Sequence, residues 1–266
     1  MSFKKEWFKV IKADNLSFSY KKGEEFIKGL NVSIEKEKIT TILGPNGSGK
    51  STLLSLFCGL NKGSSGKILI DNKNINSLKY KDIAKKIAVV HQQNSIPSDI
   101  TVEEVVSYGR IPHKKYFQGN SKEDEEIIKW SMEKTELENL KTKAVMSLSG
   151  GERQRVFIAM ALAQKSKILF LDEPTTYLDI YHQVEVLELI KKLNKEENLT
   201  VVMVLHDINQ AIKYSDNIIV MKKGKIIEAG IGEEVINMCL LNEVYNIGGY
   251  ITEYNKEKIF IPLKLK

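Results

Sequence analysis

Residues 44–51 read Gly-Pro-Asn-Gly-Ser-Gly-Lys-Ser, and they follow the short apolar run Ile39–Leu43. The next stretch, Thr52–Leu60, is apolar and has helical spacing. A strand, a glycine-rich turn and a helix in this order form a phosphate-binding loop (P-loop), in which backbone N–H groups close around phosphate oxygens. In such a loop Lys50 reaches the β- and γ-phosphates, and the Ser51 hydroxyl ligates Mg²⁺. The pattern arises by chance in about one in a hundred chains of this length, so it indicates a nucleotide site.

The composition is that of a globular protein with a sizeable core. The chain has 266 residues, of which 42% are hydrophobic and 28% charged. No apolar run approaches the roughly 20 residues that cross a bilayer, and residues 1–7 lack the apolar stretch of a secretory signal. We therefore expect a cytoplasmic protein. The net charge is +6, but the basic residues are scattered, which favours a solvated lysine surface over a nucleic-acid interface.

Arginine is rare among the basic residues. The chain has 40 Lys and Arg residues, and only Arg110, Arg153 and Arg155 are arginines. Because lysine supplies the ordinary surface charge here, we expect arginine where its planar fork of donors is needed.

Strands alternate with helices along most of the chain, which predicts an α/β fold with a mostly parallel sheet covered on both faces. Residues 92–147 differ, because their helical spacing and many charges indicate a helical insertion. Residues 240–266 form a short tail with one candidate strand, Ile259–Leu263. The other expected strands are Leu16–Tyr20, Ile39–Leu43, Ile68–Ile70, Ile87–Val90, Ile168–Leu171, Thr200–Leu205, Ile218–Met221 and Ile226–Glu228.

Three chemically capable groups directly follow apolar strands. They are the P-loop at Gly44, the pair Asp172-Glu173, and His206. Ligands bind at the carboxyl ends of the strands in an open parallel sheet, so we expect these groups at one edge. Asp172 would hold Mg²⁺, and Glu173 would orient or deprotonate an attacking water. Taken alone, Asp-Glu before Pro174 is also typical of a helix N-cap, and a single histidine is more often structural.

A second glycine run stands about a hundred residues after the P-loop. Residues 148–155 read Leu-Ser-Gly-Gly-Glu-Arg-Gln-Arg and precede an apolar helical stretch, Val156–Ala163. Backbone N–H groups at a helix start attract anions. No lysine follows these glycines, so the run is an incomplete phosphate site.

These motifs occur in the order and approximate spacing of ATP-binding cassette (ABC) ATPases, and the sequence resembles that family over roughly residues 8–240. The Leu-Ser-Gly-Gly-Glu signature at 148–152 is specific to the family. The resemblance implies a P-loop NTPase (RecA-like) core, an N-terminal antiparallel β subdomain and an inserted α-helical subdomain. The expected division is an ATPase domain at 1–240, with core and β subdomain at about 1–91 and 156–240, the helical subdomain at about 92–155, and a short C-terminal extension at 241–266.

The resemblance also implies catalytic roles. Glu173 resembles the catalytic glutamate, His206 the switch histidine, and Gln92 the glutamine that touches Mg²⁺ and responds to a membrane partner. The adjacent Gln93 leaves the last assignment open. Catalysis would then involve Glu173, His206, Gln92 and Lys50. The expected Mg²⁺ ligands are Ser51, Gln92 and Asp172.

ATP recognition follows from the same resemblance. Tyr20 resembles the aromatic residue that stacks on adenine, although an aromatic residue in a β-rich region is also typical of a core. Leu178-Asp179 is similar to the D-loop of the family. The expected ATP-binding residues are Tyr20, Gly44, Pro45, Asn46, Gly47, Ser48, Gly49, Lys50, Ser51, Thr52, Ser149, Gly150, Gly151 and Asp179.

The two glycine runs fall in separate expected subdomains, so one copy is not expected to close both on one phosphate. A head-to-tail homodimer with two-fold symmetry can do so, because each P-loop then faces the signature of the other copy. ATP would join the two surfaces, and hydrolysis would remove the bridge.

Three further stretches, Val105–His113, Thr175–Gln183 and Leu205–Ala211, resemble the ATPases of importers for ferric siderophores, haem and cobalamin. Within that group we favour an iron chelate, with haem or cobalamin as the alternative. The resemblance implies separate membrane permease subunits, an indirect substrate-binding protein, no nucleic-acid partner, and a peripheral location on the cytoplasmic face of the cell membrane. A soluble ABC ATPase of translation or repair is a further alternative, but such proteins usually carry two cassettes or long coiled-coil insertions. A regulatory module without turnover is disfavoured by the presence of Glu173 and His206.

Overall fold

The computed structural model describes residues 9–21, 23–92, 94, 96–114, 119–255 and 257–265. The chain forms two compact units: unit 1 contains residues 1–78 and 200–266, and unit 2 contains residues 79–199. The predicted subdomain boundaries near residues 92 and 155 concern a different division and stay a prediction. Among the described residues, none of the helices combines the length and the hydropathy that crossing a bilayer requires.

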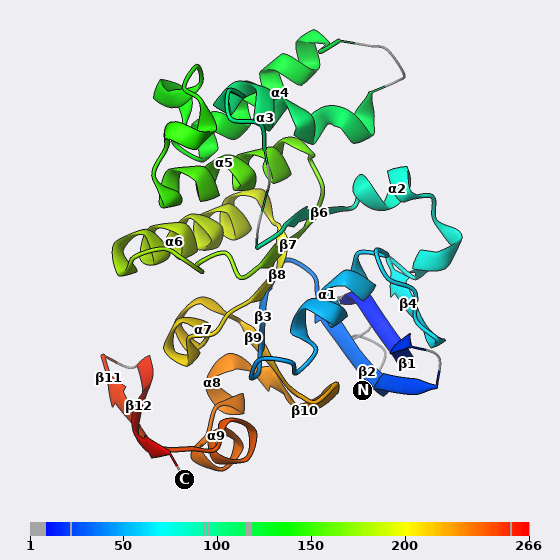
Figure 1. The fold of residues 1–266 in the computed structure, drawn as a ribbon, viewed down its shortest axis with the longest axis vertical. Helices are drawn as coiled ribbons and strands as arrows, with labels where there is room; N and C mark the ends of the chain where they lie inside the picture. The colour runs from blue at the N-terminus through cyan, green and yellow to red at the C-terminus, as the bar shows by residue number, and fades with distance from the viewer. Residues whose placement is uncertain are drawn as a thin grey trace. The chain divides into compact units, whose positions relative to one another are not determined.

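Unit 1 contains most of the strands, and Figure 1 shows how they are arranged. Its elements are β1 (Lys9–Lys21), β2 (Glu24–Glu35), β3 (Ile39–Leu43), α1 (Lys50–Phe57), β4 (Ser65–Ile70), β5 (Lys73–Asn74), β8 (Thr200–Val204), α7 (Ile208–Tyr214), β9 (Asn217–Lys222), β10 (Lys225–Ile231), α8 (Gly232–Val235), α9 (Met238–Tyr245), β11 (Ile247–Tyr254) and β12 (Glu257–Leu265).

Unit 2 is mainly helical. Its elements are α2 (Tyr80–Ala84), β6 (Ile87–Val90), α3 (Val102–Ser107), α4 (Lys122–Lys134), α5 (Gly150–Ala163), β7 (Ile168–Asp172) and α6 (Ile180–Glu197). Short 3₁₀ turns lie at Tyr108–His113, Glu138–Leu140 and Val145–Ser147. The predicted helical insertion is therefore confirmed.

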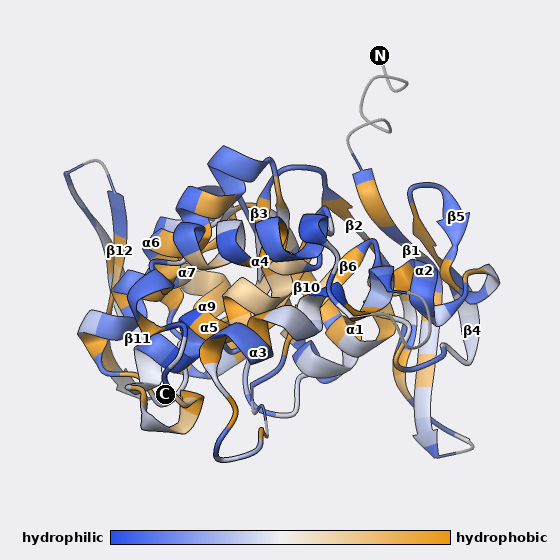
Figure 2. Ribbon diagram, turned by 90° about the horizontal axis from the view of Figure 1, so that it is seen from above, coloured by the Kyte–Doolittle hydropathy of each residue, from blue (hydrophilic) through white to orange (hydrophobic). Residues whose placement is uncertain are grey.

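The first sheet of unit 1 is antiparallel and runs in the order β2-β1-β4-β5. Buried residues along β1 include Ile11, Ala13, Leu16 and Phe18, and bands of orange and blue along the β1 arrow in Figure 2 show the mixture of apolar and polar residues. Such a mixture is expected where one face of a sheet packs on a core and the other meets water. An antiparallel N-terminal sheet is what the resemblance implied.

The second sheet of unit 1 places β3 between two parallel neighbours. Ile42 pairs with Val204 of β8 on one side and with Ile219 of β9 on the other. Every residue of β3 and of β8 is buried, as expected for central strands of a parallel sheet that is covered on both faces. β10 adds an antiparallel edge to β9. The α/β fold with a parallel core is therefore confirmed.

The C-terminal residues form more structure than the predicted tail with one strand. Helix α9 is followed by the antiparallel hairpin β11–β12, in which Ile251 pairs with Phe260. The predicted strand Ile259–Leu263 lies inside β12. The sequence signal for β11 is weak, because Gly248 and Gly249 interrupt its apolar residues.

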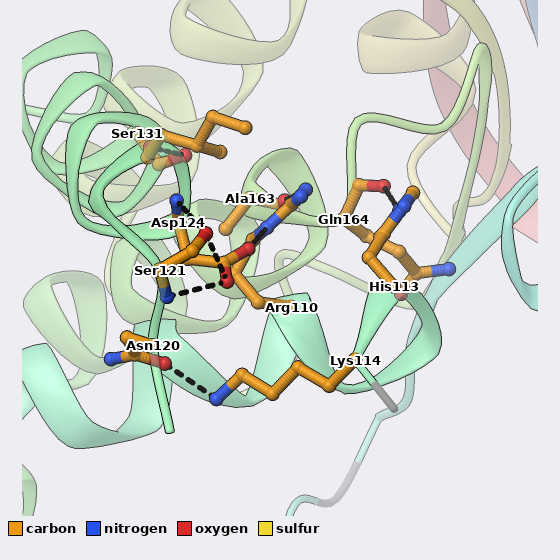
Figure 3. A network of polar contacts seen from close by, with 10 residues as sticks. Arg110, His113, Lys114, Asn120, Ser121, Asp124, Ser131, Ala163 and Gln164 are labelled. Atoms are coloured by element: carbon orange, nitrogen blue, oxygen red, sulfur yellow. Dashed lines mark hydrogen bonds and ion pairs between the residues drawn. The ribbon is translucent and has the colours of Figure 1, made fainter. Parts of the chain in front are cut away.

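A buried ion pair holds the helical part of unit 2 together. Arg110 and Asp124 are 4% and 7% exposed. Arg110 Nε donates to Asp124 Oδ1 at 2.7 Å, and Arg110 Nη1 donates to the carbonyl oxygen of Ala163 at 2.9 Å. Figure 3 shows the guanidinium of Arg110 between these partners, with Ser121 on the far side of the carboxylate. The expectation that arginine stands where a fork of donors is needed is confirmed here, since one guanidinium joins α4 to the end of α5.

The pKa of Asp124 reflects two opposed effects. Burial raises the pKa, but hydrogen bonds from Arg110 and from the backbone and hydroxyl of Ser121 outweigh burial and lower it from 3.8 to about 2. Because the folded pKa lies below the ordinary one, the pair stabilises the fold fully above the ordinary carboxyl pKa. This contribution is lost as the pH falls through about 2.

We expect Asp124→Asn to lower the free energy of unfolding by about 3–5 kcal/mol at neutral pH, because it leaves the Arg110 charge buried without its partner. Urea denaturation measures this change. The control is Glu133→Gln, which removes an exposed pair with Lys129 at 3.6 Å and should cost less than about 1 kcal/mol. If Asp124→Asn and Glu133→Gln lowered the free energy of unfolding equally, the buried pair would not be important for stability.

Candidate functional site

The glycine-rich loop of unit 1 connects the buried strand β3 to helix α1. Ser48 N–H donates to the carbonyl oxygen of Pro45 at 3.1 Å, and Gly224 N–H donates to the carbonyl oxygen of Ser48 at 2.8 Å. Lys50 is only 5% exposed, and its Nζ donates to the carbonyl oxygens of Gly44 at 2.8 Å and Pro45 at 3.2 Å. The loop therefore curls around a buried ammonium group, which is the charge that a phosphate chain requires.

Gly44 cannot be replaced by a residue with a side chain. Its φ is +153°, and an added Cβ would lie 2.2 Å from the carbonyl oxygen of Met221 and 2.6 Å from Ser48 Oγ. The backbone of β9 therefore approaches the start of the loop closely enough to require glycine.

The loop fits a phosphate chain. Ser48 is 1% exposed, and among the described residues its Oγ has no hydrogen-bond partner. A buried hydroxyl without a partner is costly, and an anionic ligand supplies acceptor oxygens. Ser51 follows Lys50 in the first turn of α1, where the helix dipole also favours anions.

Tyr20 lies at the end of β1 and is joined to the residue after the loop. Its hydroxyl hydrogen-bonds to Thr52 Oγ1, and the edge of its ring meets Phe18 with 4.8 Å between centroids. Tyr20 is 66% exposed, so the alternative that it is a core aromatic is wrong. An exposed ring fixed beside the P-loop is available for stacking.

His206 lies at the same edge of the unit 1 sheet as the P-loop. Strands β3 and β8 are parallel neighbours, and Leu205 N–H donates to the carbonyl oxygen of Ile42 at 3.4 Å. His206 follows directly, is exposed, and precedes Asp207, which caps α7 by accepting from Gln210 N–H at 2.8 Å. The prediction that Gly44 and His206 follow strands ending at one edge is confirmed.

In unit 2, Asp172 is the last residue of β7 and Glu173 follows it. Gln92 lies shortly after the parallel neighbour β6. Gln92 Nε2 donates to Glu173 Oε2 at 2.6 Å, and Thr176 Oγ1 donates to the same oxygen at 3.0 Å. The structure therefore brings Gln92 and Glu173 together, as strands ending at one edge require. Thr176 was missed by the sequence reasoning, although a hydroxyl three residues after an acid is a recurrent local hydrogen-bonding pattern. Gln93, the alternative to Gln92, lies outside the described residues.

The loop after β7 has an unusual backbone. Glu173 has a φ of +53° and Tyr177 a φ of +66°, a region that costs residues with side chains about 1–3 kcal/mol each. In this conformation the Glu173 carboxylate accepts hydrogen bonds from Gln92 and Thr176. Strain of this kind is concentrated at functional sites, and it supports a chemical role for Glu173 over the alternative of a simple helix cap.

The glycines of the second run lie inside a helix, not ahead of it. Helix α5 begins at Gly150, six residues earlier than the predicted apolar stretch, because Ser149 is its N-cap. Glu152 N–H donates to Ser149 Oγ at 3.2 Å, and Ser149 N–H donates to Glu152 Oε2 at 2.8 Å, which completes a capping box. The N–H of Ser149 lowers the pKa of Glu152. The Ser-x-x-Glu spacing at residues 149–152 is the sequence signal for this helix start. The prediction followed the apolar periodicity instead and placed the helix later.

Gly151 allows α5 and α6 to approach each other. A Cβ on Gly151 would lie 2.6 Å from His182 Nδ1 and 2.7 Å from His182 Cγ. The same ring nitrogen of His182 lies 3.1 Å from Glu185 Oε2. His182 is therefore a packing residue between the two helices. Asp179 caps α6 by accepting from His182 N–H at 3.0 Å.

An apolar surface surrounds Asp179. Tyr177, Ile180, Tyr181 and Val184 are 82%, 79%, 70% and 42% exposed. Exposed large apolar side chains of this kind are common where a protein contacts a partner or a membrane.

The expected Mg²⁺ ligands supply suitable atoms. Ser51, Gln92 and Asp172 offer hydroxyl, amide and carboxylate oxygens, which are the hard ligands that Mg²⁺ prefers. The described part of the chain contains no group of three or more His, Cys, Asp or Glu side chains that could hold a metal ion by themselves.

A P-loop after a central parallel strand, in a mixed α/β fold with helical insertions, defines a P-loop NTPase. Residues 27–176, more than half of the chain, match the model of the family described as ABC transporter. The chain therefore belongs to the ABC transporter family, as an ATP-binding cassette.

Individual relatives agree with this assignment. The chain is 45% identical over 247 residues to the petrobactin import ATP-binding protein FpuC of Bacillus anthracis, covering 92% of this chain and 91% of that protein. It is 46% identical over 225 residues to the iron(3+)-hydroxamate import ATP-binding protein FhuC of Bacillus subtilis (strain 168), covering 85% and 84%. It is similar to the dimeric ATP-binding cassette MJ0796 bound to ADP and Pi, with a TM-score of 0.71 and 35% identity over 83% of this chain and 98% of that one.

We expect Gly151→Ala to destabilise the start of α5, because the new methyl group meets the His182 ring. Thermal unfolding should show a lower Tm for Gly151→Ala than for the wild type. In a His182→Ala background, the same Gly151→Ala substitution should lower the Tm much less. If Gly151→Ala changed the Tm equally with and without the His182 ring, the close approach of the two residues would be unimportant for stability.

Proposed function

We propose that this chain is the ATP-hydrolysing subunit of an ABC importer that powers uptake of an iron chelate through separate membrane permease subunits. The observation that carries the hydrolytic part is the 2.6 Å hydrogen bond from Gln92 to the carboxylate of Glu173, made at the ends of two parallel strands. The importer part is supported by relatives named for import of petrobactin and iron(3+)-hydroxamate.

The residues of unit 1 bind and orient ATP in this proposal. The backbone N–H groups of residues 44–50 and the ammonium group of Lys50 hold the phosphates, and the exposed ring of Tyr20 stacks on adenine. Ser51, Gln92 and Asp172 would hold Mg²⁺, which would supply positive charge to neutralise the phosphates.

Glu173 activates water. Its carboxylate orients the attacking water and accepts the proton as the water oxygen bonds to the γ-phosphorus and the bond to the β-phosphate oxygen breaks. Gln92 and Thr176 hold the carboxylate through its Oε2. His206 contacts the γ-phosphate and distinguishes ATP from ADP.

A second copy completes the site. Ser149 and the first N–H groups of α5 contact the γ-phosphate bound by the P-loop of another copy, so that a homodimer forms with ATP. The exposed apolar surface at Tyr177, Ile180, Tyr181 and Val184 lies beside the D-loop residue Asp179, and it supports an interface there. The dimeric state of the similar cassette MJ0796 also supports this arrangement.

The class of compound that is transported is inferred from the relatives alone, because the residues of this chain are proposed to act on ATP and not on the cargo. Haem or cobalamin is the alternative cargo. We place the protein at the cytoplasmic face of the cell membrane, bound to its permease, with a substrate-binding protein acting indirectly on the other side.

We expect Glu173→Gln to reduce the turnover of ATP by at least about 100-fold, since proton acceptance is lost, while ATP binding persists. Sedimentation should show an ATP-dependent dimer that does not dissociate. Glu138→Gln, at an exposed carboxylate, is the matched control and should behave as wild type. Undiminished phosphate release from Glu173→Gln would remove Glu173 from its role.

The cargo is tested in a strain that lacks this gene and carries either the wild-type chain or Glu173→Gln. We expect uptake of radioactive iron from ferric siderophores only with the wild-type chain, and unchanged uptake of haem and cobalamin with both. Loss of haem or cobalamin uptake with normal siderophore uptake would contradict the proposed cargo.

A further inference from the structure

The C-terminal segment 238–265 packs against parts of unit 1 that carry functional residues. It consists of α9 and the hairpin β11–β12, and Figure 1 draws the hairpin beside α7. An isolated two-stranded hairpin is marginally stable in water, so its contacts with the rest of unit 1 determine where it lies.

The main anchor of the hairpin is the side chain of Asn209. Its Nδ2 donates to the carbonyl oxygen of Phe260 at 3.1 Å, and its Oδ1 accepts from the N–H of Phe260 at 2.8 Å. One amide therefore satisfies both backbone groups of one strand residue, as a neighbouring strand would. The side chain of Phe260 is 3% exposed, so the contact combines two directed hydrogen bonds with apolar burial.

Asn209 lies three residues after His206, in the first turn of α7. His206 stands on a short connection between two fixed elements. On one side, β8 is paired with β3 in parallel register. On the other side, the start of α7 is fixed by the Asp207 cap and by the Asn209 contact. The side chain of Asn209 therefore links the first turn of α7, just after this connection, to the hairpin.

The same segment also reaches the start of the P-loop. Tyr245, the last residue of α9, has its hydroxyl buried beside the backbone of Gly44, without a hydrogen bond of regular geometry to the described residues. Burial raises the pKa of this hydroxyl, and the Gly44 backbone partly offsets the rise. Only one residue, Asn246, separates Tyr245 from β11. One continuous segment thus contacts both the P-loop and the helix that follows His206.

We propose that Asn209 is a positioning residue for ATP hydrolysis: by holding Phe260 of the hairpin β11–β12, it fixes the start of α7 and thereby the orientation of His206. The inference rests on the role of His206 in the proposed function. It gives the C-terminal segment a part in catalysis without contact with the nucleotide. A purely structural anchor would affect stability but leave the environment of His206 and the turnover number unchanged.

The test uses the full chain with Asn209→Ala. We expect kcat for ATP to fall about 3- to 10-fold, the size typical of coupling through a packed element. The KM for ATP should stay within about 2-fold, because the P-loop and Tyr20 are untouched. The chain has 4 histidines, so their imidazole NMR signals can be assigned by substitution, and only the signal of His206 should shift.

Two further variants separate the causes. Asn209→Asp keeps the shape and the acceptor but loses the donor to the Phe260 carbonyl, so kcat should fall as in Asn209→Ala. Lys258→Ala removes a hairpin contact outside α7, the 2.7 Å hydrogen bond from Lys258 Nζ to the carbonyl oxygen of Glu233. This control should leave kcat and the His206 signal unchanged.

The outcomes are distinct. A lowered Tm in Asn209→Ala with unchanged kcat and an unchanged His206 signal would overturn the positioning role. A loss confined to KM would overturn it as well. Normal kcat in His206→Ala would instead overturn the proposed function of His206, whatever the behaviour of Asn209→Ala. Loss of kcat in both single variants, with no further loss in the double variant, supports the inference.

Discussion

The close approach of two backbones at Gly44 is the constraint on which the nucleotide site depends. An added Cβ at Gly44 would lie 2.2 Å from the carbonyl oxygen of Met221, so the loop can begin only where β3 and β9 run side by side. Strand β3 is wholly buried and lies between β8 and β9, and this burial fixes the strand from which the loop leaves. The Lys50 ammonium is then held inside the loop by two carbonyl oxygens. The packing of these strands thus places the positive charge of Lys50 where a phosphate can bind.

Unit 2 places its chemistry in a related way but adds strain. Strands β6 and β7 run in parallel register, and the residues that follow them, Gln92 and Glu173, share a hydrogen bond. The positive φ of Glu173 costs energy that the core of the unit must offset. The buried Arg110–Asp124 pair contributes to that core, because it ties α4 to α5. The cap at Ser149 belongs to the same α5, so the signature is presented by a helix that is fixed at both ends.

The sequence predicted what depends on local pattern. The P-loop, most of the strands, and Glu173 and His206 at strand ends were found from local pattern, whereas β2, β5 and β11 were not among the expected strands. Gln92 was assigned only through the family resemblance. What the sequence missed depends on contacts between distant residues. The need for glycine at position 151 arises from the His182 ring, and the strand β11 owes its place to its pairing with β12 and to the Asn209 contact. The start of α5 was misplaced because a capping box, not apolar periodicity, determines it.

The central claim is that Ser149 serves the nucleotide of another copy. Its most direct test compares two affinities in a Glu173→Gln background that also carries Ser149→Ala: ATP binding at protein concentrations where the chain is monomeric, and ATP-driven dimerisation measured by sedimentation. Ser121→Ala removes the equivalent cap of α4 and controls for lost helix stability. The account predicts that Ser149→Ala leaves monomer affinity within about 2-fold and weakens dimerisation by at least about 10-fold, the loss expected when a hydrogen bond to a charged group is removed. An equal fall in monomer affinity would contradict it.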